Sequence, residues 1–426
     1  MWVRKRIDIG WADLASALAH CLFSNRVDTT AVNQCWRDSR HAFTCLSVRS
    51  GLDILLQALD LPRGSEVIVS AMTIDGILKI IAEHGLVAVP VDLQFETLAP
   101  TPEDVESAIT DQTRLVLIAH LFGTQIEMQP YARITEQHGL LLIEDCAQSF
   151  RGMPQGKSDV SDVAMYSFGP IKTGTALGGA VLCVADGKLR KKMEQVQQAY
   201  PTQSTMAYFK RVVKYGFLKF LSQRLPITVF IAALRMLGKD YSEILKKSVK
   251  GFPTDKLFSR IRQQPCQALL SVLKRRITSF NERRLERHCE LGELLCDHLS
   301  QQYDLPGSTA TSNYFWVFPV ETENPLETIQ HLRACGFDAD QRGSMVKVPT
   351  VPTMRGTVVQ SISTTDRILD RSVFLPIYPA MSKQAINQLA KAFCQVAVRH
   401  CRPEEDQSPT VDACAHSVPE ILVRDI

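Results

Sequence analysis

The sequence predicts an α/β protein, with a large domain built on a mostly parallel sheet and a smaller α/β domain after it. Short apolar runs alternate with helical segments of about ten residues between positions 66 and 184. Several of these apolar runs end abruptly in polar or acidic residues, as buried parallel strands do at a binding edge. The length of 426 residues also exceeds what one small core fills, which favours two domains.

Residues 1–45 are expected to form an N-terminal arm with a helix over 11–23, where apolar residues recur at helical spacing. The next segment, 44–51, is predicted to be a strand that turns at Gly51 into a helix over 52–61. A strand, a glycine turn and a helix N-terminus together favour an anion site. Many α/β proteins carry the same turn for packing alone, so both interpretations stay open.

The large domain is assigned to residues 46–195, and its segments alternate strictly. The predicted strands are 66–71, 86–92, 114–123, 140–145, 163–168 and 180–184, and the predicted helices are 73–83, 101–109, 128–138 and 188–198. Ligands of such sheets bind at the carboxyl ends of the strands. Polar residues at or just beyond these ends are Thr73, Asp92, His120, Asp145 and Ser167.

The rest of the chain divides by composition. We expect a helical insert at 196–258, linking helices at 259–300, a small C-terminal domain at 301–401 and a loosely held polar tail at 402–426. The linking region is predicted to be one long amphipathic helix or two, beginning after Pro265. In the small domain we expect strands over 314–320 and 373–375 and helices over 326–335 and 382–398, the first helix ending at Gly336.

Composition excludes several classes of protein. A net charge of +3 is too small to favour nucleic acid as a partner. The 12 cysteines show neither CxxC pairing nor zinc spacing, so we expect reduced thiols, no metal and a cytoplasmic protein. The N-terminus lacks the apolar core of a signal peptide, and no uninterrupted apolar run approaches the roughly 18 residues of a spanning helix.

The segment 207–250 is unusually basic. It has ten Lys or Arg against Asp240 and Glu243, which is +8. Its longest uncharged run, Leu225 to Leu234, is ten residues and too short to cross a bilayer. Peripheral contact with an anionic membrane is one interpretation; a lid or a dimer-packing hairpin is the other.

The residues with the most specific chemistry lie between 140 and 184. Asp145 ends one predicted strand, and Ser167 ends the next, five residues before Lys172. A pyridoxal phosphate site needs this set: a lysine for the Schiff base, an acid for the pyridinium nitrogen, and hydroxyls with loop amides for the phosphate.

Four stretches, taken in order, resemble one known family. They are SGLDILLQALDLPRGSEVIV, VPVDLQFETLAPTPEDVESAITDQTRLVLIAHLFG, HGLLLIEDCAQSFRG and YSFGPIKTGTALGGAV. Together they resemble the DegT/DnrJ/StrS-type sugar aminotransferases, which have the fold-type I pyridoxal phosphate architecture. The likeness is continuous over about 44–184 and weaker through 262–300 and 314–398, and the opening residues and the long insert suggest a longer subgroup.

The resemblance implies roles for individual residues. Lys172 would form the Schiff base and later move the proton, Asp145 would pair with the pyridine nitrogen, and Gln148 would lie beside the cofactor ring. Ser167, with the backbone amides of Gly51 and Leu52, would bind the phosphate. His120 is expected to wall the cleft rather than to act as a catalyst.

The chain also departs from the family pattern. Leu52 replaces the usual Thr after Gly51, and Ile74 stands where many members place an aromatic residue against the cofactor ring. Ala176-Leu177 precede Gly178-Gly179 in place of Gly-Glu. Relatives that dehydrate sugars carry His at the lysine position, so Lys172 argues against dehydration.

The resemblance therefore implies a pyridoxal phosphate-dependent aminotransferase, with pyridoxamine phosphate as its intermediate form. The substrates would be a keto sugar, expected to be nucleotide-linked, and glutamate or glutamine. A homodimer is implied, in which Arg262 or Asn281 of the partner chain reaches the phosphate or substrate. The alternatives are an enzyme acting on a non-sugar ketone, a membrane-surface enzyme acting on a lipid-linked sugar, and a non-catalytic regulatory protein that keeps the fold.

Overall fold

A computed structural model describes residues 1–4, 6–23, 27–36, 41–153, 160–236, 256–341, 343–349 and 362–400. The predicted tail and residues 237–250 of the basic segment lie outside this part. The helices are α1 (Trp11–Leu22), α2 (Thr29–Asn33), α3 (Val48–Leu59), α4 (Asp75–Glu83), α5 (Pro102–Ser107), α6 (Gln129–Gln137), α7 (Gly187–Gln198), α8 (Thr205–Leu221), α9 (Arg224–Met236), α11 (Leu257–Ile261), α12 (Gln267–Thr278), α13 (Glu282–Leu299), α14 (Pro325–Ala334), α15 (Ser363–Arg371) and α16 (Lys383–His400).

Strands form one large sheet and three small ones. The strands are β1 (His41–Cys45), β2 (Glu66–Ser70), β3 (Met72–Ile74), β4 (Val87–Val91), β5 (Thr113–Ala119), β6 (Thr124–Gln125), β7 (Leu141–Asp145), β8 (Val163–Ser167), β9 (Ala180–Val184), β10 (Ser312–Asn313), β11 (Phe318–Glu321), β12 (Asp340–Gln341), β13 (Met345–Lys347) and β14 (Ser372–Leu375). The large sheet has seven strands in the order β1-β9-β8-β7-β5-β2-β4. Strands β4, β2, β5, β7 and β8 are parallel, and β9 pairs antiparallel with both β8 and β1. The predicted mostly parallel α/β sheet is confirmed.

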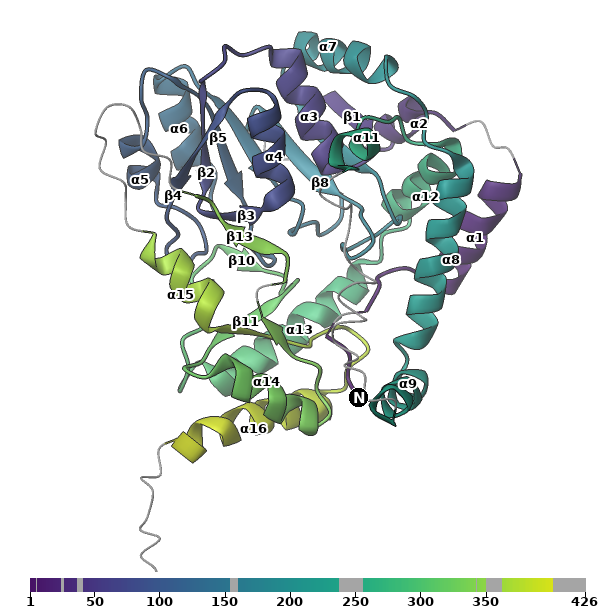
Figure 1. Ribbon diagram of the computed structural model, residues 1–426, viewed down its shortest axis with the longest axis vertical. Coiled ribbons are helices and arrows are strands. Elements are labelled where there is room, and N and C mark those ends of the chain that lie inside the picture. The colour runs from purple at the N-terminus through teal and green to yellow at the C-terminus, as the bar shows by residue number, and fades with distance from the viewer. Residues whose placement is uncertain are drawn as a thin grey trace, which may run out of the picture.

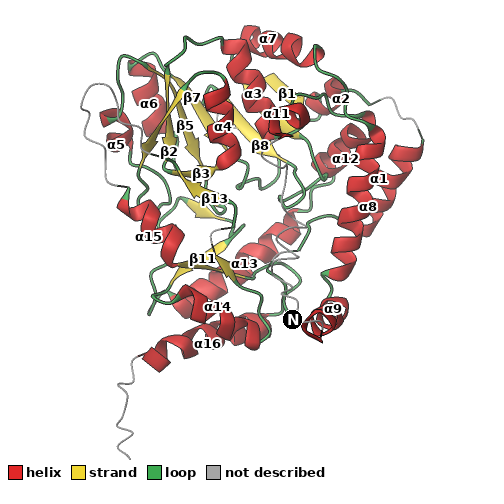
Figure 2. Cartoon of the chain, viewed as in Figure 1, coloured by secondary structure: helices red, strands yellow, loops and turns green. Residues whose placement is uncertain are grey.

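Helices cover both faces of the large sheet (Figure 2). Apolar side chains alternate along each strand, so that Val67 and Val69 pack on the α3–α4–α7 side while Ile68 packs on the α5–α6 side. On the second face, α1, α8 and α12 cover β8 and β9 through Ala164, Val181 and other buried residues. The alternation matters for the site, because it assigns each residue at a strand end to one face.

The C-terminal part packs below the large sheet in Figure 1, around a second apolar core. Strands β11, β14 and β12 form its antiparallel sheet, against which α13, α14 and α16 contribute buried residues. Two short antiparallel pairs join this part to the large domain, β13 with β3 and β10 with β6. The two parts therefore meet beside the carboxyl ends of the parallel strands.

Four predicted boundaries are wrong for identifiable reasons. The strand predicted over 114–123 ends at Ala119, because Phe122 and Gly123 have φ values of +57° and +103° that interrupt an extended chain. Helix α3 begins at Val48 rather than at residue 52, because the Ser47 side chain caps it by accepting a hydrogen bond from the Ser50 amide. The helix predicted from 73 begins at 75, because residues 72–74 form β3, which pairs with β13 from far along the chain. The strand predicted from 314 starts at 318, since Phe315 has a φ of +52° that interrupts an extended chain.

The linking region forms two helices, α12 and α13, separated by a short break at residues 279–281. Gly336 follows α14 with a φ of +90°, as predicted for a residue that ends a helix. Within the described residues, no helix is both long and apolar enough to cross a bilayer.

Candidate active site

Lys172 lies in the loop between β8 and β9, on a turn in which its amide donates to the carbonyl of Gly169 over 3.0 Å. Its Nζ lies 4.2 Å from the centroid of the Trp316 ring. The side chain is half-buried, and burial lowers its pKa to about 8. The negative charge of Asp145 opposes this change and the positive charge of Arg49 adds to it. Near neutral pH a useful fraction of this amine is therefore uncharged and nucleophilic.

Asp145 is the last residue of β7, at the centre of the sheet edge. Its Oδ1 accepts a hydrogen bond from the Ala147 amide over 2.9 Å. Burial raises the pKa of this carboxyl, while the hydrogen bond and the charges of Lys172 and His120 act in the opposite direction. A cation placed beside this carboxylate would therefore relieve an unfavourable buried charge.

Ser167 ends the neighbouring strand β8 and is buried. A Cβ added to Gly169 would lie 3.6 Å from the Ser167 Oγ and 3.8 Å from the Lys172 Cγ. The hydroxyl and the lysine stem thus approach the same point of the loop. By strand alternation, Asp145 and Ser167 share the α3 side of the sheet, because Ile143 and Met165 two residues earlier belong to the core on that side.

Gln148 lies in the loop after β7, half-buried. Its Oε1 accepts a hydrogen bond from the Phe122 amide over 2.9 Å, and its Nε2 lies 3.9 Å from the Met345 sulfur. The carboxamide therefore ties the loop after β7 to the loop after β5. Its predicted place beside a cofactor ring stays a prediction.

The phosphate turn predicted at Gly51 and Leu52 lies inside α3, not before it. The Gly51 amide is used within the helix, where it donates to the carbonyl of Ser47 over 2.9 Å. A Cβ at Gly51 would come within 2.5 Å of Leu182 Cδ1, so this glycine allows the helix to pack against β9. The first turn instead runs from Ser47 to Arg49, and Arg49 extends its side chain over Gly76 at the start of α4.

His120 points to the other face of the sheet. Its Nε2 lies 2.8 Å from Glu144 Oε1, and its Nδ1 accepts a weak 3.4 Å hydrogen bond from the Ile126 amide. Glu144 also accepts hydrogen bonds from Ser161 and Cys146. These side chains are all buried. His120 therefore belongs to an internal polar cluster on the α5–α6 side of β7.

The remaining predicted residues contact their own chain. Ile74 ends β3 and is half-buried beside β13. Arg262 donates to both oxygens of Asp53 over 3.0 Å each, and Asn281 caps α13 by accepting from the Arg284 amide over 3.0 Å. Whether Arg262 or Asn281 also reaches a partner chain stays a prediction.

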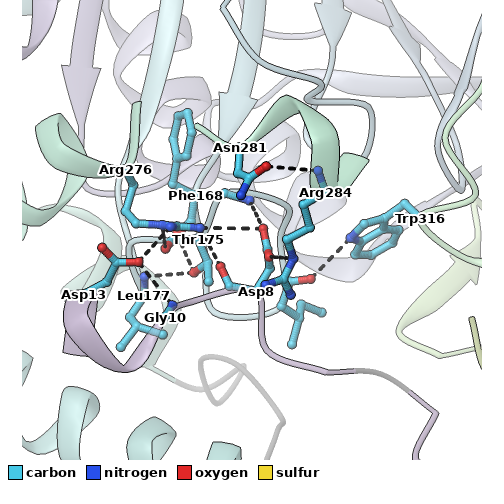
Figure 3. Close-up of polar contacts among 12 residues, drawn as sticks. Asp8, Gly10, Asp13, Phe168, Thr175, Leu177, Arg276, Asn281, Arg284 and Trp316 are labelled. Atoms are coloured by element: carbon cyan, nitrogen blue, oxygen red, sulfur yellow. Dashed lines mark hydrogen bonds and ion pairs between the residues drawn. The ribbon is translucent and has the colours of Figure 1, made fainter. Parts of the chain in front are cut away.

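Arg276 joins the N-terminal arm to the loop between β8 and β9, which carries Lys172 and which we call the lysine loop (Figure 3). Its guanidinium donates to the Thr175 carbonyl, the Asp8 carbonyl and Asp13 Oδ2 over 3.1, 2.7 and 2.8 Å. Asp8 in turn accepts from the Gly174 amide over 2.6 Å. The arm therefore fixes residues that immediately follow Lys172.

Three side chains of the site region were not found from the sequence: Arg49, Arg276 and Trp316. Trp316 donates from its Nε1 to the Ile171 carbonyl over 3.2 Å, although 145 residues separate the two. No local pattern marks such a contact. The sequence does offer a signal for Arg49, because serine is a preferred N-cap residue and Ser47 stands two positions before it.

Comparison with known proteins gives one family and several relatives. The family model described as "DegT/DnrJ/EryC1/StrS aminotransferase family" matches residues 31–223. A "Pleiotropic regulatory protein" of Geobacillus stearothermophilus is 33% identical over 162 residues, 37% of this chain and 44% of the relative. A UDP-N-acetyl-3-dehydro-alpha-D-glucosamine 3-aminotransferase of Acidithiobacillus ferrooxidans is 33% identical over 156 residues, 36% of this chain and 42% of the relative. The match thus spans less than half the length of either curated relative.

Likeness to solved structures extends much further than likeness in sequence. DesV of S. venezuelae, solved in complex with a ketimine intermediate, superposes with a TM-score of 0.64 at 22% identity, covering 91% of this chain and 94% of DesV. The agreement establishes the fold over nearly the whole chain, including the C-terminal part beyond residue 223. Residues 31–223, less than half of the chain, thus match the model of the DegT/DnrJ/EryC1/StrS aminotransferase family, and the fold is shared with DesV over nearly the whole chain.

Proposed function

We propose that the protein is a pyridoxal phosphate-dependent aminotransferase that transfers an amino group from glutamate or glutamine to a keto sugar carried on a nucleotide. The observation that carries the proposal is the meeting of Lys172, Asp145 and Ser167 at one edge of the sheet. The lysine has a pKa of about 8, the carboxylate is buried, and the carboxylate and the hydroxyl share the α3 side of the sheet.

These residues fit the cofactor by their chemistry. Asp145 is a buried carboxylate that a protonated ring nitrogen would neutralise. Arg49, the Ser167 hydroxyl and the amides at the start of α3 form a donor set suited to a phosphate. When bound, pyridoxal phosphate supplies an electron sink and a carrier for the amino group.

The chain's own groups then have separate tasks. The Lys172 Nζ would hold the cofactor and would move the proton at the substrate carbon, for which its lowered pKa leaves part of it neutral. The Asp145 carboxylate would favour a proton on the ring nitrogen. Trp316, above the Lys172 amine, keeps water from it.

The substrate class rests on the relatives. The Acidithiobacillus relative is named for a UDP-linked dehydro sugar, and that name supports a nucleotide-linked keto sugar here. We also propose that the protein is a cytoplasmic homodimer, with Arg262 or Asn281 of the partner subunit near the phosphate or substrate.

The test is reconstitution of the purified full-length chain with pyridoxal phosphate, followed by borohydride reduction and peptide mapping. We expect a visible absorbance band that glutamate bleaches, and a reduced adduct on Lys172. Lys172→Ala should lose both, whereas Lys191→Ala, which removes an exposed lysine of α7, should keep both. A wild-type chain that gains no colour and no adduct would refute the aminotransferase.

That negative result would favour the second candidate, a regulatory protein that keeps the fold. One observation supports this alternative: the Geobacillus relative, 33% identical over its matched part, is named as a pleiotropic regulatory protein. The two candidates differ in whether Lys172 reacts with the cofactor and whether an amino donor reverses the spectrum.

A further inference from the structure

Among the described residues, helices α8 and α9 each leave one side uncovered. Tyr208, Val212 and Tyr215 on the inner side of α8 are buried in the core shared with α1 and α12. The outer side carries large apolar residues that are at least half exposed: Met206, Val213, Phe217 and Phe220 of α8, and Leu225, Val229 and Met236 on α9. We call this set the α8–α9 face; in Figure 1 the two helices lie on the right-hand side of the molecule, α8 beside α1 and α9 below it.

The sequence of the two helices and their flanking residues carries charge of one sign only. Residues 201–236 contain six basic residues, Lys210, Arg211, Lys214, Lys219, Arg224 and Arg235, and no Asp or Glu. Across the whole chain the two signs nearly balance, at 48 basic and 45 acidic residues. Lys210, Lys214 and Arg224 are exposed among the apolar residues of the face.

A cavity of about 660 Å³ opens where the link between α8 and α9 meets the N-terminal arm. It is lined by Arg6, Lys219 and Arg224, together with Trp11 and Pro226 among other residues. The Arg6 Nε is buried and has no hydrogen-bond partner among the described residues. Burial and the positive charges of Arg284 and Arg6 lower the pKa of Lys219, against the charge of nearby Asp8.

Asp8 does not neutralise this cavity by itself. Its carboxylate pairs with Arg284 over 2.9 Å and also lies 3.7 Å from Arg276. The recess therefore remains cationic and has the volume of a small-molecule site. A phosphate group would supply acceptor oxygens to the cations that line it.

We propose that the α8–α9 face docks the protein on an anionic phospholipid surface, with a lipid headgroup phosphate in the cationic cavity and the exposed apolar side chains in the headgroup–acyl boundary. Exposed Phe, Leu and Val interleaved with Lys and Arg are the composition of helices that lie in a membrane interface. The proposal concerns surface contact alone and is independent of the proposed reaction.

A second copy of this chain is a poorer occupant of the face. Two such faces would bring cations against cations, and residues 201–236 offer no carboxylate to pair with them. An anionic bilayer, by contrast, complements both the apolar residues and the charge. Because its charge complements that of the face, an anionic membrane is favoured over a second copy of the chain.

The test is flotation of the full-length protein with vesicles of phosphatidylcholine, alone or mixed with anionic phosphatidylglycerol. We expect binding to the anionic vesicles and little to the neutral ones. Each Lys or Arg near such a surface contributes about a fivefold factor in partitioning, so Lys210→Gln with Lys214→Gln should weaken binding about 25-fold. Phe217→Ser with Phe220→Ser should weaken it at least about tenfold.

The matched control is Lys191→Gln with Lys192→Gln, which removes two exposed charges from α7 and should leave binding unchanged. Lys172→Ala should also bind vesicles normally, which separates this proposal from the aminotransferase. Equal binding to neutral vesicles, or no binding to anionic ones, would overturn the proposal. So would light scattering that shows an oligomer which the Phe217→Ser with Phe220→Ser variant converts to monomers. Circular dichroism checks that each variant is folded.

Discussion

The Nζ of Lys172 lies 4.2 Å from the centroid of the Trp316 indole, which comes from the part of the chain that follows α13. The indole N–H also donates to the carbonyl of Ile171, the residue before the lysine. One aromatic side chain thus covers the amine and holds its backbone. The contact links the two parts of the fold at the reactive group.

Removing the indole should raise the pKa of Lys172. Burial is the main reason that this pKa is about 8, and Trp316→Leu admits water to the amine. We expect an upward change in this pKa, measured from the pH dependence of amine labelling in the cofactor-free protein. Trp316→Phe retains a covering ring and should change the pKa less. An unchanged pKa in Trp316→Leu would mean that other groups desolvate the lysine.

Arg276 should matter more to stability than its neighbour Arg275, although both pair with Asp13. The Arg276 side chain is 13% exposed and the Arg275 side chain is 46% exposed. Arg276→Met removes a largely buried cation that pairs with the carboxylates of Asp8 and Asp13. Because these charges would then lack a partner, the free energy of unfolding should fall by about 3 kcal/mol. Arg275→Met should lower it by about 0–1 kcal/mol. Urea denaturation measures the free energy of unfolding of both variants. Equal losses would show that the largely buried ion pairs of Arg276 stabilise the fold no more than the exposed pair of Arg275.

The same Arg276 variant should loosen the lysine loop. Its guanidinium bonds to the Thr175 carbonyl, and its partner Asp8 accepts from the Gly174 amide. Limited proteolysis should therefore cut near residues 173–177 faster in Arg276→Met than in Arg275→Met. A purely global loss of stability would instead increase cleavage throughout the chain.

Gly51 and Gly216 both lie inside helices, but alanine should have opposite effects at the two positions. A Cβ at Gly51 would lie 2.5 Å from Leu182 Cδ1, whereas at Gly216 the nearest atom is 3.9 Å away. Gly51→Ala should lower the free energy of unfolding by about 1–3 kcal/mol through overpacking. Gly216→Ala should raise it by about 0.5–1 kcal/mol through helix propensity. A stabilised Gly51→Ala would show that α3 does not need this close approach to β9.

Local patterns were enough to place the acid and the lysine of the site. Asp145 and Lys172 follow apolar runs whose lengths define buried strands, and parallel strands bring their carboxyl ends together. The start of α3 was misplaced by four residues because the stretch SVRSG offers two starting points. The serine cap at 47 prevailed over the glycine turn at 51.

Long-range contacts were beyond the sequence. Trp316 meets Ile171 and β13 meets β3 only after the C-terminal part has packed on the sheet edge. His120 shows the limit of reasoning from strand ends alone. It lies at the correct edge, but alternation turns its side chain to the far face, toward Glu144.

Asp145 and Arg49 should shift the pKa of Lys172 in opposite directions. The charge of Asp145 raises this pKa and the charge of Arg49 lowers it, while burial sets the overall decrease to about 8. Asp145→Asn should therefore lower the pKa further, and Arg49→Met should raise it. The neutral fraction of the amine grows as pH rises through the pKa, so labelling of Lys172 should begin at lower pH in the first variant and at higher pH in the second.

Cofactor-free protein is the right material for this measurement, because both residues are also proposed to contact the cofactor. Mass spectrometry of the labelled peptide distinguishes Lys172 from the other lysines. Arg63→Met, at a site that contacts Gly85 away from the lysine loop, serves as the control for loss of one positive charge. Shifts of the same sign in Asp145→Asn and Arg49→Met would contradict the electrostatic account. They would mean that both substitutions act by changing how deeply the lysine is buried.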